Sequence, residues 1–398
     1  MGFAGTVSVG NVFVGDLWVL AGQSNMQGVG DLIDVTPPNP HVALLGMDGR
    51  WGQAKEPLHW LVDSPDPAHS GDPTTREARS AAEHKTRTKG TGLGLPFAST
   101  LTAATGVPIG LVACAHGGTS MEQWNPSKKD EGGKSLYGSM LRQFQLAGGK
   151  VKGVLWYQGE SDAMQKPEVV AAYPQVFTDF IAAVRADFNQ PDLPFYLVQI
   201  GRFINSSDPK KWNSVQDVQR RIPEQVANTA VVSVIDLELD DSIHVGTQGM
   251  KRAGNRLAQI ALRELFGQVG ATTPTLDRVT RGAGNTLVVK LKGVNMRMQS
   301  LGGFQSVPPF GTAPGIGLRP ARHIGGFSIV DAEGKKIPLI FEAAVGQSRD
   351  TVVLKLSSPP PKGASLWYGH GLDPYCNLTD ALDMSVPVFG PIPLDEVK

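Results

Sequence analysis

The first two thirds of the chain alternate short apolar runs with longer amphipathic patterns, and this alternation constrains the fold more than any other feature. The apolar runs occupy residues 17–21, 109–113, 154–157, 195–200 and 231–237. Because successive residues in each run are apolar, we expect strands that are covered on both faces of a sheet. Helical patterns lie between them, at residues 97–105, 136–147, 169–188, 214–224 and 247–265. The alternation predicts an α/β fold with a doubly wound parallel sheet of about five strands, whose ligands bind beyond the carboxyl ends of the strands.

Residues 31–93 interrupt this rhythm. The stretch has little periodicity, contains seven prolines and ends in the mixed-charge segment 76–89. Loops of this length in a compact domain are usually functional or mobile. Since the stretch follows the first expected strand, we expect a long loop insertion over the ligand face. A surface excursion without a function is the alternative.

After about residue 269 the helical patterns stop. Alternating runs at residues 286–291, 326–330, 338–342, 351–356 and 365–368 are separated by Gly, Pro and Asp turns. This pattern is typical of a small all-β sandwich. The sequence therefore predicts two domains, an α/β domain over residues 1–269 with the insertion at 31–93, and a β-sandwich domain over residues 270–398.

Composition excludes several classes of function. Lys plus Arg and Asp plus Glu are both 37, so the formal net charge is +0, which argues against nucleic acid or an anionic membrane surface as the partner. Cys114 and Cys376 are the two cysteines, too few for a disulfide framework or a cysteine-built zinc site. No histidines or carboxylates stand at the spacing of a helical metal site, no run could span a membrane, and the first ten residues lack the pattern of a signal peptide. Composition leaves the oligomeric state open.

Ser24 follows the first expected strand, within the segment Gly22-Gln23-Ser24-Asn25-Met26. A serine just past a buried parallel strand lies at the ligand face, where its hydroxyl is accessible and its backbone N–H can face a bound oxyanion. Ser24 is therefore a candidate nucleophile. The alternative is a serine that caps the following helix.

Asp241 and His244 follow the last expected strand and precede a helix. At a spacing of three, the carboxylate can accept a hydrogen bond from the ring and leave the other ring nitrogen to take a proton from a serine. Asp240 adjoins Asp241 and is the competing partner, with the spacing favouring Asp241.

Two further strand ends carry hydrogen-bond donors. Gly117 and Gly118 offer N–H groups free of side chains, and Gln158 offers a side-chain amide. Donors that converge above a sheet are the parts of an oxyanion hole. Alternatively, the glycines only permit a tight turn and Gln158 only satisfies loop backbone.

Four motifs now resemble a known family. GQSNM, AHGGT, WYQGESD and DSIH occur in the order seen in the SGNH hydrolase superfamily, in the branch of sialate O-acetylesterases and family 6 carbohydrate esterases, which includes acetyl xylan esterases. The segments Tyr-Gly-His-Gly at 368–371, Asn-Leu at 377–378 and Pro-Val-Phe at 387–389 are also similar to the C-terminal β segment of sialate O-acetylesterases.

The resemblance implies an SGNH-hydrolase-like (flavodoxin-like) fold and assigns roles. It makes Ser24 the nucleophile, His244 the general base and Asp241 its partner. The oxyanion hole would comprise the N–H of Ser24, the N–H of Gly117 or Gly118, and the amide of Gln158. Supporting positions would be Gln23, Asn25, Glu160 and Asp162. His116 and Trp124 are candidate substrate contacts, with a structural role for His116 and core packing for Trp124 as the alternatives.

The expected function is that of a carbohydrate O-acetylesterase, which hydrolyses acetyl esters on sugars through a serine and needs no metal or organic cofactor. Its partner would be an acetylated glycan or an acetylated sugar. A non-catalytic carbohydrate-binding module and a lipid or thioester hydrolase on the same fold are the alternatives. The resemblance implies a secreted or periplasmic protein, and a cytoplasmic location stays open.

Overall fold

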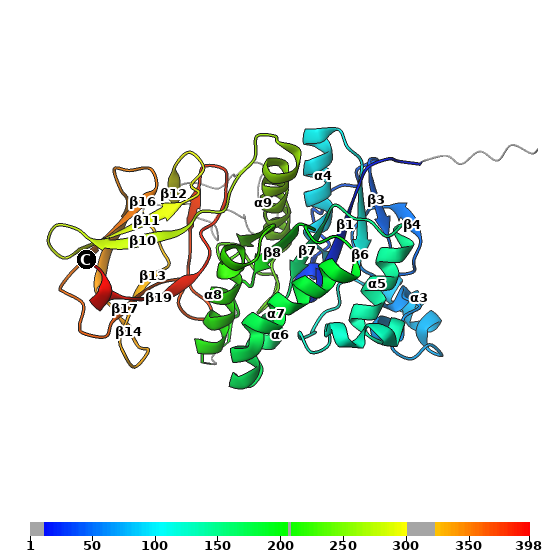
Figure 1. Cartoon of the computed structure of the whole chain (residues 1–398), viewed down its shortest axis with the longest axis horizontal. Coiled ribbons are helices and arrows are strands. Elements are labelled where there is room, and N and C mark those ends of the chain that lie inside the picture. Colours follow the sequence, from blue (N-terminus) through cyan, green and yellow to red (C-terminus); the bar gives the residue numbers. More distant parts are fainter. Residues whose placement is uncertain (1–11, 206–207, 301–322) are drawn as a thin grey trace, which may run out of the picture.

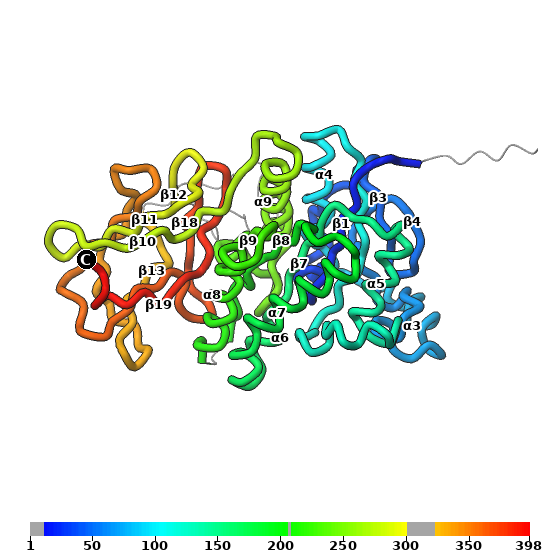
Figure 2. The backbone as a smooth tube through the Cα atoms, in the orientation of Figure 1, coloured from blue at the N-terminus to red at the C-terminus, as the bar shows by residue number. Residues whose placement is uncertain are grey.

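The structure, a computed structural model, describes residues 12–205, 208–300 and 323–398. These residues form two parts, which lie at opposite ends of the long axis in Figure 1. An α/β part surrounds one large sheet, and a β part follows residue 270. Helices α8 (Lys210–Gln225) and α9 (Thr247–Phe266) belong to the side of the α/β part that is nearer to the β part (Figure 2).

The large sheet has seven strands. Their spatial order is β4 (Trp51–Gln53), β3 (Val42–Leu45), β6 (Ile109–Ala113), β1 (Asp16–Gly22), β7 (Gly153–Tyr157), β8 (Phe195–Gln199) and β9 (Thr229–Ser233). All neighbours pair in parallel except β3 and β4. Strands β3 and β6, which come earlier in the chain, lie on one side of β1, and strands β7, β8 and β9, which come later, lie on the other side. Such a reversal of strand order leaves a crevice beyond the carboxyl ends of the central strands.

Helices cover both faces of this sheet. The expected helical patterns correspond to α4 (Gly94–Thr105), α5 (Leu136–Leu146), α7 (Pro167–Asp187), α8 and α9. Every residue of β6, β7 and β8 is buried, as expected for strands that are apolar on successive residues. Helix α9 packs closely on α4, since a side chain on Gly254 would lie 2.4 Å from the Leu93 carbonyl oxygen.

The segment 31–93 is not the long loop that the sequence analysis predicted. It contains β3 and β4, so the expectation of about five strands is too low by two. The segment begins at β2 (Gly30–Asp31) and also contains η1 (Leu61–Asp63), α2 (Pro67–Ser70), α3 (Arg76–Thr86) and β5 (Lys89–Thr91). The two extra strands escape a periodicity test because β3 is four residues long and β4 is exposed along its whole length.

The β part is built from antiparallel strands. Its elements are β10 (Thr275–Arg281), β11 (Thr286–Lys292), β12 (Met298–Ser300), β13 (Phe327–Val330), β14 (Lys336–Ile337), β15 (Ile340–Val345), β16 (Thr351–Leu356), β17 (Ser365–Tyr368), β18 (Leu378–Asp380), β19 (Phe389–Pro393) and η3 (Leu394–Glu396). One four-stranded sheet has the order β10-β11-β16-β15, another has the order β14-β13-β17-β19, and β12 pairs with β18.

Both four-stranded sheets contribute to one hydrophobic cluster. Leu287 and Leu354 enter it from the first sheet, and Ile329 and Leu366 from the second. The cluster is separate from the larger one in the α/β part. The domain boundary expected near residue 269 lies between the end of α9 and the start of β10, and it stays a prediction.

None of the helices in the described ranges is long and apolar enough to cross a membrane.

Candidate active site

Ser24 lies at the crevice, where β1 ends and the short helix α1 (Ser24–Gln27) begins. Gly22 adopts φ +134°, and a side chain there would lie 2.2 Å from the Tyr157 carbonyl oxygen. That carbonyl also accepts a hydrogen bond of 2.8 Å from the Gln23 N–H. The turn is therefore held against the end of β7, and this contact fixes where α1 presents Ser24. The Ser24 side chain is half-buried.

Asp241 and His244 form a hydrogen-bonded pair. The Asp241 Oδ2 atom lies 2.7 Å from His244 Nδ1, and Asp241 Oδ1 accepts the N–H groups of Ile243 and His244 at 2.9 Å each. Partial burial acts to raise the pKa of Asp241, but these hydrogen bonds outweigh it and hold the pKa below its usual value. With Nδ1 bound to the carboxylate, the other ring nitrogen of His244 can act as a base.

Asp240 has a different task. Its Oδ2 atom accepts the N–H of Asp31 at 2.7 Å and the N–H of Thr247 at 3.2 Å. Asp240 thus binds the first turn of α9 and the start of the segment 31–93, whereas its neighbour Asp241 contacts the ring of His244.

Asn25 joins the segments of Ser24 and His244. Its side chain is 1% exposed. The Oδ1 atom accepts the Val245 N–H at 3.0 Å, and Nδ2 contacts the Ile243 carbonyl at 3.4 Å. Both residues that flank His244 are therefore attached to the residue that follows Ser24.

Gln23, Glu160 and Asp162 complete this buried polar cluster. Asn25 Nδ2 donates to Glu160 Oε1 at 2.8 Å, and burial raises the pKa of Glu160 to about 7. Gln23 Oε1 accepts N–H groups from the segment around α6 (Glu160–Ala163), at 3.2 Å from Ser161 and 3.4 Å from Gly159. Asp162 accepts the Met121 N–H at 3.0 Å, which joins the segment that follows β6 to the segment that follows β7.

The four expected oxyanion donors divide into two groups. Gln158 Nε2 donates to the Thr119 carbonyl at 3.1 Å and to Asp162, and the N–H of Gly117 donates to Gln27 Oε1 at 2.8 Å. The N–H groups of Ser24 and Gly118 have no acceptor among the residues that the structure describes. The first pair is engaged in this conformation, and the second pair is available to a ligand.

The candidate substrate contacts differ in accessibility. Trp124 is 0% exposed, donates its indole N–H to Thr119 Oγ1 at 2.9 Å and packs edge-on against Trp156. No face of its ring is open to a sugar, which favours the packing alternative. His116 is partly accessible and follows β6, two residues before Gly118.

The segment 31–93 supplies contacts that the sequence reading missed. His69 Nδ1 lies 3.1 Å from His116 Nδ1, and His59 Nδ1 lies 3.0 Å from the Gln27 carbonyl oxygen. Burial lowers the pKa of His69 to about 3 and that of His59 to about 4, so both rings are neutral near pH 7. Both histidines stand in a segment without periodicity, and no sequence pattern signals these contacts.

No group of three metal-binding side chains gathers in the described ranges, and Cys114 and Cys376 are both free and buried.

Comparison with known proteins adds three findings. A model of the family described as carbohydrate esterase, sialic acid-specific acetylesterase matches residues 14–263. A probable carbohydrate esterase of Arabidopsis thaliana is 29% identical over 268 residues, which is 62% of this chain and 90% of the relative. The crystal structure of a carbohydrate acetylesterase from Xanthomonas citri superposes with a TM-score of 0.67 at 22% identity, covering 94% of this chain and 80% of that one. The last match extends over the β part as well, so a solved protein shares the fold of both parts.

Proposed function

This chain belongs to the carbohydrate esterase, sialic acid-specific acetylesterase family, and from that premise we propose that it hydrolyses acetyl esters of sugars through Ser24, His244 and Asp241. The single observation that carries the assignment of residues is the 2.7 Å contact between His244 Nδ1 and Asp241 Oδ2. A carboxylate in this position orients the ring and stabilises the imidazolium that forms when the ring takes a proton. Asn25 supports the assignment, because it joins the segment of His244 to the residue next to Ser24.

In the proposed reaction, His244 removes the proton of the Ser24 hydroxyl as the oxygen attacks the acetyl carbonyl. The protonated ring then passes that proton to the sugar oxygen as the ester bond breaks. Water next attacks the acetyl-enzyme, with His244 again as the base, and releases acetate and free Ser24.

The N–H groups of Ser24 and Gly118 are the proposed donors to the oxyanion. Gly118 is preferred to Gly117 because the Gly117 N–H already donates to Gln27. Gln158 would become a third donor after its amide turns away from Asp162. An oxyanion needs such donors most in the transition state, where its charge is largest.

The substrate is proposed to be a neutral polysaccharide or a small acetylated sugar. A formal net charge of +0 gives no reason to expect a strongly charged polymer. Acetate release from acetylated xylan, acetylated sialic acids and other acetylated glycans would identify the sugar.

The test of the mechanism is Ser24→Ala. We expect the variant to keep the circular dichroism spectrum of the wild type and to lose hydrolysis of 4-nitrophenyl acetate and labelling by a serine-directed fluorophosphonate. Hydrolysis at the wild-type rate by Ser24→Ala would rule out Ser24 as the nucleophile.

A further inference from the structure

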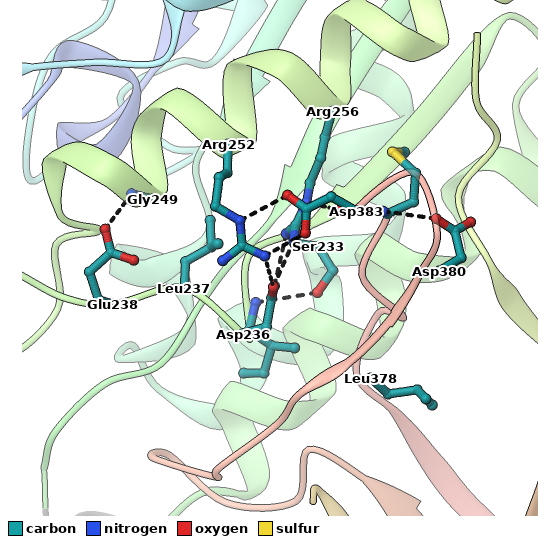
Figure 3. Close-up of polar contacts among 12 residues, drawn as sticks. Ser233, Asp236, Leu237, Glu238, Gly249, Arg252, Arg256, Leu378, Asp380 and Asp383 are labelled. Atoms are coloured by element: carbon teal, nitrogen blue, oxygen red, sulfur yellow. Dashed lines mark hydrogen bonds and ion pairs between the residues drawn. The ribbon is translucent and has the colours of Figure 1, made fainter. Parts of the chain in front are cut away.

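Four charged side chains join the α/β part to the β part (Figure 3). Asp236 follows β9, Arg252 and Arg256 lie on α9, and Asp383 belongs to the β part. Arg256 binds Asp236 through both terminal nitrogens, at 2.7 and 2.8 Å, and Arg252 binds the same carboxylate at 2.8 Å. Arg252 also binds both Asp383 oxygens, at 2.5 and 2.8 Å. Two acids and two bases balance, so the cluster carries no net charge.

The cluster is buried where it meets the α/β part. The side chains of Arg256 and Asp236 are 1% and 2% exposed, and that of Asp383 is 34% exposed. Burial acts to raise the pKa of Asp236, but the guanidinium groups of Arg256 and Arg252 outweigh it and hold the pKa below its usual value. Asp236 is therefore ionised near pH 7, and the side chain of Asp383 binds the second guanidinium group, that of Arg252, through both of its oxygens.

The members of this cluster lie on both sides, in the sequence, of the loop that carries Asp241 and His244. Asp236 lies immediately before the loop, and both arginines lie on the helix that begins after it. The cluster therefore fixes the two ends of the loop relative to each other. Within the loop, the Glu238 carboxylate accepts the Gly249 N–H (Figure 3), so the loop is also bound to the first turn of α9.

A second set of contacts reaches the same loop from the β part. Arg202 binds Asp373 at 2.6 Å and donates to the Leu237 carbonyl at 3.1 Å. The Phe203 N–H donates to the Leu372 carbonyl at 2.8 Å, and the next N–H, that of Ile204, donates to the Ser242 carbonyl at 2.7 Å. Ser242 lies between Asp241 and His244 in the sequence.

The turn that presents Asp383 is itself held in place. Asp383 adopts φ +62°, a left-handed conformation that is uncommon outside glycine and that aspartate and asparagine tolerate better than other residues. Asp380 Oδ1 accepts the N–H groups of Leu382 at 3.0 Å and Met384 at 3.1 Å, on either side of Asp383. The position of the Asp383 carboxylate is thus determined by the β part.

We propose that the β part holds the catalytic loop in place, and that Asp383 is a positioning residue for His244. It acts through Arg252, Arg256 and Asp236 and does not touch the substrate. The proposal rests on the proposed role of His244, and it assigns the β part a task in catalysis other than sugar binding.

The test compares Asp383→Asn with Glu342→Gln. Glu342 forms an ion pair of 2.9 Å with Lys355, both partners are about half exposed, and the pair links β15 to β16 within the same β part. The measured quantities are the rate constant of Ser24 labelling by a fluorophosphonate and the kcat for 4-nitrophenyl acetate per titrated active site. Neither depends on the fraction of protein that is folded.

For Asp383→Asn we expect both quantities to fall about tenfold, with KM changed less than about twofold, because a small displacement of a catalytic group lowers the rate strongly. Glu342→Gln should match the wild type. Labelling of Asp383→Asn at the wild-type rate would overturn the proposal, even if its melting temperature falls.

If Asp383→Asn does not fold, Asp373→Asn takes its place, since it removes the charge that binds Arg202 in the second set of contacts and leaves the buried cluster intact. We expect a fall of about threefold in the labelling rate. An unchanged rate in that variant would overturn the proposal as well. Wild-type protein that does not label at all would instead contradict the proposed function.

Discussion

The two parts of the molecule bury polar side chains in different places. In the α/β part, Gln23, Asn25, Gln158, Glu160 and Asp162 are all at most 3% exposed and surround the end of β1. In the described portion of the β part, the four buried polar residues all lie within residues 377–385, the stretch that carries Asp383. A buried polar group is costly unless it is hydrogen-bonded, so such groups indicate where a structure fixes geometry. One part fixes Ser24 and His244, the proposed nucleophile and base, and the other fixes the contact between the two parts.

The largest effect on activity is expected from His244→Ala. Loss of the base should lower kcat at least about a thousandfold, because nucleophile and base act as a unit. Steady-state kinetics with 4-nitrophenyl acetate measures it. The matched change in the β part is His323→Ala, at an exposed histidine, which should leave kcat unchanged. A similar loss of kcat in both variants would contradict the assignment of the base to the α/β part.

The next effect is expected from Asn25→Ala. It leaves the Val245 N–H without its acceptor and removes the side-chain donor of Glu160, so kcat/KM should fall roughly tenfold to a hundredfold. The free energy of unfolding should fall by about 1–3 kcal/mol.

Its control is Asn377→Ala, at an asparagine that is also 1% exposed but binds Gly325 and His323 within the β part. Urea titration should give a comparable loss of stability, with a much smaller loss of kcat/KM. Equal losses of activity in the two variants would contradict the special position of Asn25.

A smaller effect, on stability rather than rate, is expected from Glu160→Gln. The pKa of Glu160 is raised from 4.5 to about 7, so the folded protein keeps its proton while the unfolded chain loses it. The wild type is therefore fully stabilised by this group below pH 4.5 and loses that contribution as the pH rises to 7. The variant does not titrate here. Between pH 5 and 8 its stability relative to wild type should rise, by up to about 3 kcal/mol.

Urea titrations of both proteins across this pH range measure the difference. Asn25 can still donate to the Oε1 atom of the glutamine, so activity should change little. A stability difference that stays constant from pH 5 to 8 would show that Glu160 ionises in the folded protein as it does in the unfolded chain.

The smallest effect on activity is expected from Leu354→Ala. Leu354 is 0% exposed in the hydrophobic cluster of the β part, so the truncation should cost about 2–5 kcal/mol of unfolding free energy. At temperatures where the variant stays folded, kcat should equal that of the wild type, because Leu354 lies on β16, which pairs with β11 and β15 within the β part. A kcat reduced in proportion to stability would extend the role of the β part beyond the Asp383 contact.

The sequence predicts the frame of the site well, for physical reasons. Buried parallel strands are apolar on successive residues, so each of β6, β7 and β8 is recognisable as a short run. The spacing of three also favours Asp241 over Asp240 as the partner of His244, and the structure has this contact. Both patterns are local, which is why one sequence suffices to find them.

The remaining features depend on contacts between distant segments. His69 lies next to His116 only because the segment 31–93 folds back against the residues that follow β6, and nothing in its local pattern indicates this. The burial of Trp124 follows from its packing on Trp156, and the orientation of the Gln158 amide follows from the position of Asp162. The role of Asp383 is equally hidden, since its partners lie more than a hundred residues earlier.

The end of β8 bears on how the two parts could be separated. The side-chain amide of Gln199 accepts the Val388 N–H at 2.8 Å and donates to the Val388 carbonyl at 3.0 Å, so it pairs with that backbone as a strand residue would. Gln199 is 0% exposed. An α/β fragment that ends near residue 269 would expose this amide and the side of Arg256 that contacts Asp383. We expect such a fragment to need substitutions at both positions to remain soluble. We therefore expect that the β part cannot simply be replaced by that of another esterase. In a chimera, the residues on both sides of this contact surface should come from the same parent protein.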